Sequence, residues 1–158
     1  MQLTSSSFQQ GAEIPDYYTS DGEDASPELS WRDAPSGTKS FALIVHDPDA
    51  PRPGGFTHWT VYNIPPETGH IEENVPDTER VTGLGTQGKN DGGKIGYMGP
   101  APPSGTHRYF FRLYALDTML NLGVRAATHK EVSDAIKGHV LAQAELMGTY
   151  QNKKERAA

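Results

Sequence analysis

The sequence predicts a mainly β protein with a helical C-terminal part, on three observations. Residues 41–45 are a short apolar, partly β-branched run between Lys39-Ser40 and an Asp-Pro-Asp turn, which indicates a buried strand. Residues 57–64, rich in Thr, Trp, Val and Tyr and stopped by two prolines, predict a second strand. Residues 110–117 predict a third, with period-two character. A length of 158 residues fits one domain spanning residues 1–158.

The first 40 residues predict short strands joined by turns. Glycine and proline recur there at short spacings, and no helical period is sustained. Leu29 and Trp31 are two residues apart in an extended stretch, so they are expected on one face, in the core.

The end of the chain predicts two consecutive helical pieces. Residues 128–131 fit a capping box, and apolar residues then follow helical spacing as far as Gly148. Gly138 predicts a break between the pieces, because glycine costs a helix about 1 kcal/mol relative to alanine. Both pieces are expected to cover the sheet. Residues 153–158 are expected to be a frayed tail, since nothing apolar remains to dock them.

Composition excludes several function classes. The net charge of −6 and pI near 5.4 argue against a nucleic-acid or anionic-membrane partner. The absence of cysteine excludes disulfides and thiolate metal sites. No apolar run approaches the roughly 20 residues of a membrane helix, and residues 1–10 lack the features of a secretory signal. A cytoplasmic protein with small-molecule or protein partners is therefore expected.

The stretch from His46 to Trp59 is the first candidate wall of a polar pocket. Pro48 favours extended backbone at Asp47, so Asp47 and Asp49 are expected to project to one side. Neighbouring carboxylates need donors, and His58 is the nearest candidate. Strand parity places His58 with Thr60 and Tyr62, opposite Trp59 and Val61. The alternative is an ordinary Asp-Pro-Asp surface turn.

Residues 96–109 supply a companion wall. A proline- and glycine-rich loop runs into a strand that begins with His107 and Tyr109, whose face is shared with Phe111, Leu113 and Ala115. Backbone N–H groups in such loops can form anion-binding concavities. A hydrogen-bonded structural histidine is the alternative role for His107.

Residues 83–88 match the glycine pattern of a dinucleotide-binding loop. That motif requires a strand before it and a helix after it, whereas Asn90-Asp91-Gly92-Gly93 follows here. The match lies in the long connection 65–96, which is acidic and then glycine-rich. Nucleotide binding by this loop is not expected.

Several motifs together resemble the phosphatidylethanolamine-binding protein (PEBP) family, in particular its bacterial and archaeal Raf-kinase-inhibitor-like branch of YbhB/YbcL type. They are Asp47-Pro48-Asp49-Ala50-Pro51, His58-Trp59, and Gly96-Tyr97-Met98-Gly99-Pro100 running on to His107-Arg108-Tyr109. The stretches 26–31, 114–117 and 139–142 add support, so the resemblance covers nearly the whole chain. It implies a mainly β fold, α+β by some counts, in which a large antiparallel sheet packs on a smaller one with peripheral helices.

The resemblance also implies a binding site and a function. Asp47, Asp49, His58, His107 and Tyr109 match the pocket side chains of the family, with Gly99 and Pro100 on the rim. Family members bind phosphate or phosphoethanolamine-like groups and include inhibitors of kinases and serine peptidases. A non-enzymatic binding protein without metal or cofactor is implied, and a homodimer is expected only by analogy with bacterial relatives. Ala101 departs from the cysteine of many relatives, so lipid and mammalian kinase partners do not carry over.

Anion binding beside two aspartates requires an explanation. We expect Asp47 and Asp49 to accept hydrogen bonds from the imidazoles, which orients the rings while their outward donors face the ligand. Two alternatives remain. Two Asp and two His could hold a divalent ion in a metal-assisted hydrolase, although no His-x-x-x-His spacing occurs. The polar cluster could instead only rigidify an interaction module.

Overall fold

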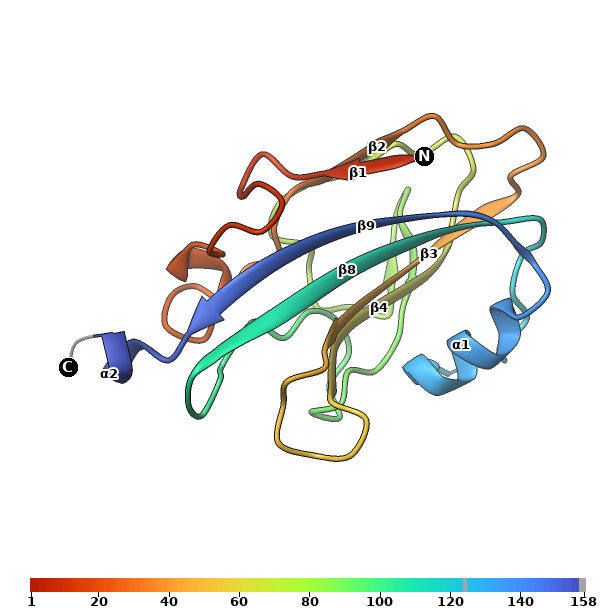
Figure 1. Cartoon of the computed structure of the whole chain (residues 1–158). Coiled ribbons are helices and arrows are strands. Elements are labelled where there is room, and N and C mark those ends of the chain that lie inside the picture. Colours follow the sequence, from red (N-terminus) through yellow and green to blue (C-terminus); the bar gives the residue numbers. More distant parts are fainter. Residues whose placement is uncertain (124, 157–158) are drawn as a thin grey trace.

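The chain folds into two antiparallel sheets with one main helix, as the computed structural model shows for residues 1–123 and 125–156 (Figure 1). The larger sheet has the order β6-β7-β4-β3-β8-β9. Its strands are β3 (Ser40–Asp47), β4 (Phe56–Ile64), β6 (Arg80–Val81), β7 (Gly85–Gln87), β8 (Thr106–Leu116) and β9 (Val140–Gln151). The smaller sheet has the order β1-β2-β5, from β1 (Gln2–Thr4), β2 (Leu29–Arg32) and β5 (His70–Ile71). A 3₁₀ helix, η1 (Asp16–Tyr18), precedes β2.

The main core lies between the two sheets, which confirms the predicted packing of a large sheet on a smaller one. Leu29 and Trp31 of β2 are buried, as predicted, and the Trp31 ring meets Phe41 of β3 at a centroid distance of 5.4 Å. The inward face of the large sheet adds alternate residues of its strands, including Leu43, Val45, Trp59, Phe111, Leu113 and Leu146. Burial of these apolar side chains supplies most of the driving force for folding.

Helix α1 (His129–Ile136) covers part of the opposite face of the large sheet. Its predicted capping box is confirmed: the Thr128 hydroxyl accepts from the Glu131 N–H, and the Glu131 carboxylate accepts from the Thr128 N–H. Val132 and Ile136 are buried in a second cluster with Ala42, Ile44, Tyr62 and Leu116 of the sheet. Among the described residues, no helix is both long and apolar enough to cross a membrane.

The second predicted C-terminal helix is wrong, because residues 140–151 form strand β9. This strand pairs along the whole of β8, from Leu116↔Val140 to Thr106↔Gln151. Gly138 has φ +82°, a left-handed conformation that ends α1 and suits glycine. The apolar residues after it fit a period of two as well as a helical period, since Ala144, Leu146 and Tyr150 are buried while Gln143 and Glu145 are exposed.

Two further expectations have different outcomes. The last residues were expected to fray, but α2 (Lys153–Arg156) follows β9, and the Lys153 ammonium lies 3.3 Å from the Asp16 carboxylate. Residues 157–158 lie outside the described residues. The glycine pattern at 83–88 belongs to the β6–β7 hairpin, paired Arg80↔Thr86 and Val81↔Gly85, so the strand–helix context of a dinucleotide loop is absent.

Candidate functional site

A cavity of about 250 Å³ opens where the central strand β3 ends and its neighbour β8 begins. Its polar lining includes Asp47, His58, His107 and Tyr109, all predicted site residues, and the charged side chain of Arg52, which was not predicted. The remaining lining residues are Ala50, Pro51, Phe56, Met98, Gly99, Ala101, Pro102 and Pro103. The two predicted walls, residues 46–59 and 96–109, therefore meet. Asp49 and Pro100 are the two predicted residues that do not line the cavity.

A β-bulge sets the direction of His58. The β3–β4 register runs from Val45↔Trp59 directly to His46↔Thr57, so His58 is an extra residue without a partner on β3. The parity prediction for His58 is therefore wrong. The His58 ring lies on the same face of the sheet as Trp59, and its centroid is 5.2 Å from that of the Tyr109 ring. Tyr62 packs on the opposite face, under α1.

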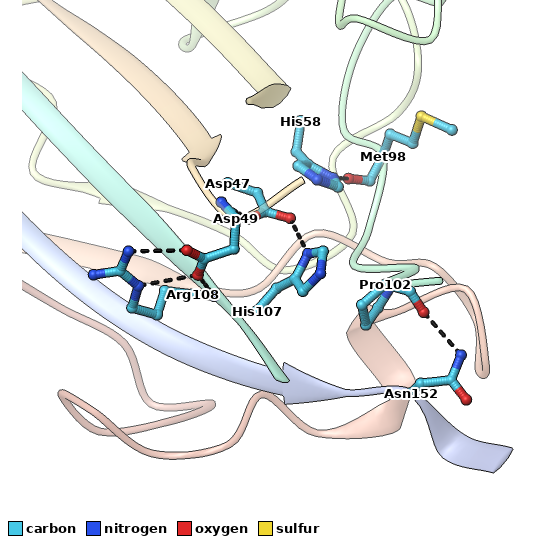
Figure 2. A network of polar contacts seen from close by, with 8 residues as sticks. All are labelled: Asp47, Asp49, His58, Met98, Pro102, His107, Arg108 and Asn152. Atoms are coloured by element: carbon cyan, nitrogen blue, oxygen red, sulfur yellow. Dashed lines mark hydrogen bonds and ion pairs between the residues drawn. The ribbon is translucent and has the colours of Figure 1, made fainter. Parts of the chain in front are cut away.

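Asp47 and His107 form a buried pair at the floor (Figure 2). His107 Nδ1 lies 2.6 Å from Asp47 Oδ2, and the two side chains are 8% and 3% exposed. The other carboxylate oxygen, Oδ1, accepts from the backbone N–H of Asp49 at 2.8 Å. Both Asp47 oxygens are thus engaged by protein donors, and the predicted bond from imidazole to Asp47 is present.

Asp49 turns away from the imidazoles, contrary to the expectation that it would orient one of them. It forms a two-pronged pair with Arg108, whose Nε and Nη2 donate at 3.0 and 2.9 Å (Figure 2). These bonds lower the pKa of Asp49 to about 2. Arg108 lies between His107 and Tyr109 in the strand, so its side chain leaves on the opposite face and draws Asp49 with it.

His58 is tied to the proline-glycine loop rather than to a carboxylate. Its Nδ1 lies 2.5 Å from the Met98 carbonyl oxygen, and the Met98 N–H donates to the His58 carbonyl oxygen at 2.9 Å. Burial lowers the pKa of His58, because a charged imidazole would lose its hydration. The contact between Nδ1 and the Met98 carbonyl oxygen fixes the orientation of the His58 ring.

The Tyr109 hydroxyl is buried beside the two imidazoles. It is one of three buried polar side-chain atoms that have no hydrogen-bond partner among the described residues. The Tyr109 ring is stacked near His107, with centroids 6.5 Å apart, and meets His58 edge-on. Burial raises the pKa of Tyr109, and the negative charge of Asp47 raises it further, so the hydroxyl keeps its proton.

The loop that forms the outer wall is held in place from behind. The Gly99 N–H donates to Asp24 Oδ1 at 2.9 Å, and a Cβ on Gly99 would collide with Asp24 and with the backbone of Tyr18 and Thr19. Asn152 Nδ2 donates to the Pro102 carbonyl oxygen at 2.9 Å (Figure 2). Pro100 is buried, and its carbonyl oxygen accepts from Ser20.

Sequence reasoning missed several residues of the site. Arg108 carried a signal, since it stands directly between the predicted pocket residues His107 and Tyr109. Its parity is opposite to theirs, so it is a natural partner for a carboxylate that faces away from the pocket. Arg52 and Phe56 lie within the first motif, and the Arg52 guanidinium sits 5.4 Å from the Phe56 ring centroid at the mouth. Asp24 and Asn152 are remote in sequence, and no local pattern marks them.

The arrangement of ligand atoms does not favour the metal-assisted alternative. Within residues 1–123 and 125–156, no three His, Asp or Glu side chains are grouped so as to hold a metal ion. The Asp47 and Asp49 carboxylates are committed to His107 and Arg108. Besides Asp47, the polar side chains that line the cavity are His58, His107, Tyr109 and Arg52.

Comparison with known proteins agrees with this geometry. The family model described as phosphatidylethanolamine-binding protein matches residues 4–151. A UPF0098 protein of Methanothermobacter thermautotrophicus is 52% identical over 151 residues, covering 96% of this chain and 99% of that protein. Two solved structures superpose with a TM-score of 0.87. They are CT736 of Chlamydia trachomatis, described as a PEBP homologue (41% identical; 96% and 97% coverage), and Escherichia coli YbcL, described as a member of the mammalian PEBP family (34% identical; 96% and 98%).

Proposed function

The chain belongs to the phosphatidylethanolamine-binding protein family, and we propose that it is a non-enzymatic binding protein that takes a small phosphate-like anion beside His58, His107 and Tyr109. The unpartnered Tyr109 hydroxyl carries this proposal. A buried hydroxyl without a partner costs free energy, so its retention at the floor of a cavity favours a ligand that completes it.

Asp47 does not prevent anion binding in this arrangement. Its two oxygens are occupied by His107 and by the Asp49 N–H, so the carboxylate faces protein donors instead of the ligand. With Nδ1 bonded to Asp47, His107 has Nε2 left for a ligand in the cavity. Arg52 adds positive charge at the mouth.

The surroundings of the cavity suit modulation of a protein partner. A site of about 250 Å³ with few polar contacts provides little intrinsic affinity, so specificity must come from neighbouring surface. Ala50, Pro51, Phe56, Pro102 and Pro103 give that rim an apolar character. A protein kinase or serine peptidase that presents an anionic group to the cavity is the kind of partner proposed.

Tyr109→Phe is expected to weaken phosphate binding about ten- to a hundredfold, because the variant removes one hydrogen bond to a charged ligand. The free energy of unfolding is expected to stay constant or rise, since the hydroxyl has no partner among the described residues. Isothermal calorimetry with inorganic phosphate and urea unfolding measure the two quantities.

Tyr150→Phe is the matched control. The Tyr150 hydroxyl is bonded to the Asp16 and Asp21 carboxylates away from the cavity lining, at 2.8 and 2.6 Å. Its removal is expected to cost about 1–3 kcal/mol of stability and to leave the phosphate Kd unchanged. Equal phosphate Kd values for wild-type protein and Tyr109→Phe would refute the proposed site.

A further inference from the structure

We propose that the chain pairs with a second copy of itself along the outer edge of β9, so that two large sheets join across a two-fold axis. The inference goes beyond the proposed function and does not depend on it, because this edge takes no part in the anion cavity. Three observations carry it. The edge is long, half of it is unpaired, and the two ends of the unpaired half complement each other.

β9 is the one long edge strand of the two sheets that the described residues form. It has 12 residues and stands last in the order β6-β7-β4-β3-β8-β9, at the border of the large sheet (Figure 1). The other edge strands, β6, β1 and β5, have 2, 3 and 2 residues. Short edges offer few main-chain groups to another chain, whereas a long edge offers a full row. A further strand would therefore pair on β9.

Residues 10–14 cover only the second half of this edge. The Gly11 N–H donates to the Met147 carbonyl oxygen at 2.7 Å, and the Thr149 N–H donates to the Ala12 carbonyl oxygen at 2.9 Å. The main chains at positions 147 and 149 thus face away from β8 and are already paired. This edge accepts a neighbouring extended segment where the chain supplies one.

The first half of the edge, residues 140–146, is open. The β8–β9 register is regular beyond Ala142, so strand alternation turns the main chains of Gln143 and Glu145 outwards as well. Among the described residues, nothing pairs with the N–H and C=O groups of these two. Two common protections of an open edge are missing, since the stretch has neither proline nor lysine. Its one charged side chain, Glu145, is paired with Arg112 at 2.9 Å.

The two ends of the open half differ in a complementary way. Val140 and Leu141, at its start, are large apolar residues that are each 42% exposed. The other end borders an open cleft of about 590 Å³. The apolar residues that line this cleft are Met1, Leu3, Phe8, Ala144 and Leu146. An exposed apolar pair at one end and a partly apolar cleft at the other form the two halves of one contact.

A two-fold axis at Gln143 brings these halves together. Antiparallel pairing about this residue places its N–H and C=O against those of Gln143 in the second copy, and Leu141 of each copy opposite Glu145 of the other. Val140 and Leu141 of each copy then lie at the cleft of the other. The paired stretch ends where residues 10–14 already occupy the edge, so it uses the whole open half. This self-complementarity assigns the edge to a second copy.

The pairing leaves both anion cavities accessible. The open half of β9 pairs with the end of β8, up to Leu116↔Val140, whereas the cavity lies where β8 begins, near Thr106↔Gln151. One dimer therefore carries two cavities. A partner with two suitably spaced anionic groups would gain avidity from such a pair of sites.

Sedimentation equilibrium of the whole chain tests the proposal. At about 100 μM, the wild-type protein is expected to have twice the 17.2 kDa mass of one chain. Gln143→Pro removes an outward N–H and no hydrogen bond to β8, so the mass is expected to fall twofold. Gln143→Thr, the matched control, keeps the N–H and is expected to keep the doubled mass. A wild-type protein with the mass of one chain overturns the inference, and so does a doubled mass in folded Gln143→Pro.

A cysteine cross-link tests the register, and it decides the question if Gln143→Pro does not fold. The chain has no cysteine, so Gln143→Cys carries a single thiol. Opposite Cα atoms in a hydrogen-bonded antiparallel pair are about 5.5 Å apart, which a disulfide can span. Mild oxidation is expected to link most Gln143→Cys chains in pairs. Thr149→Cys, on the covered half of the same edge, is expected to stay unlinked. Equal cross-linking of the two variants, or none in Gln143→Cys, overturns the proposed pairing.

Discussion

Gly55→Ala is expected to lower the free energy of unfolding by about 3–5 kcal/mol, whereas Gly54→Ala costs only about 1–2 kcal/mol. Both glycines have φ +78°, so both substitutions carry the strain of a left-handed alanine. A Cβ on Gly54 meets nothing within 4 Å. A Cβ on Gly55 would lie 2.8 Å from His46 Nε2 and 3.0 Å from Pro48 Cα, and still closer to the Asp47 carbonyl oxygen.

Both variants carry the same backbone strain, so the difference between their stability losses measures the collision of the new Cβ with the end of β3. Relief of the collision requires Asp47 to move, so Gly55→Ala is also expected to weaken phosphate binding, while Gly54→Ala leaves it near the wild-type value. Urea unfolding and phosphate titration of both variants provide the measurements. Equal stability losses would show that the loop does not fix the position of Asp47.

His107→Ala has the second large expected effect, a loss of about 3–5 kcal/mol, because it leaves the Asp47 carboxylate buried without its main donor. His139→Ala is the matched control. It breaks a His–Asp pair of similar length, 2.8 Å to Asp117, in which both side chains are nearly half exposed, and is expected to cost about 0–1 kcal/mol.

A double variant separates two contributions to the stability loss of His107→Ala: the uncompensated charge of Asp47 and the lost packing of the imidazole. Asp47→Asn combined with His107→Ala removes the charge that His107→Ala strands, so the double variant is expected to be more stable than His107→Ala alone. Chemical denaturation of the wild-type protein, Asp47→Asn, His107→Ala and the double variant measures this coupling. A His107→Ala protein as stable as His139→Ala would contradict the account of Asp47–His107 as a structural pair.

The sequence predicted well which residues line the cavity, and predicted poorly which way their side chains point. The Asp-Pro-Asp turn and the start of β8 were found because proline, glycine and period-two patterns are local signals, and Asp47, His58, Gly99, His107 and Tyr109 all line one cavity. The His58 bulge was missed because parity counting assumes an uninterrupted strand. An extra residue in β4 is visible only against its partner β3.

Two other errors have the same physical origin, since they depend on partners remote in sequence. Asp49 faces Arg108, and the two residues come together only because β3 pairs with β8. The apolar residues of 140–151 fit both a helical period and a strand period. They form a strand because β8 offers backbone hydrogen-bonding groups along its whole length, which β9 pairs with. The capping box at Thr128 was predicted correctly because all of its atoms lie within four residues.

The most direct test of the anion pocket follows the ring signals of His58 and His107 by NMR while phosphate is added at several pH values. Both rings are expected to shift saturably, because both line the cavity that is proposed to take the anion. Rings that stay unmoved at every pH would contradict the proposal. The Asp47–His107 cluster would then serve only to hold the ends of β3 and β8 together.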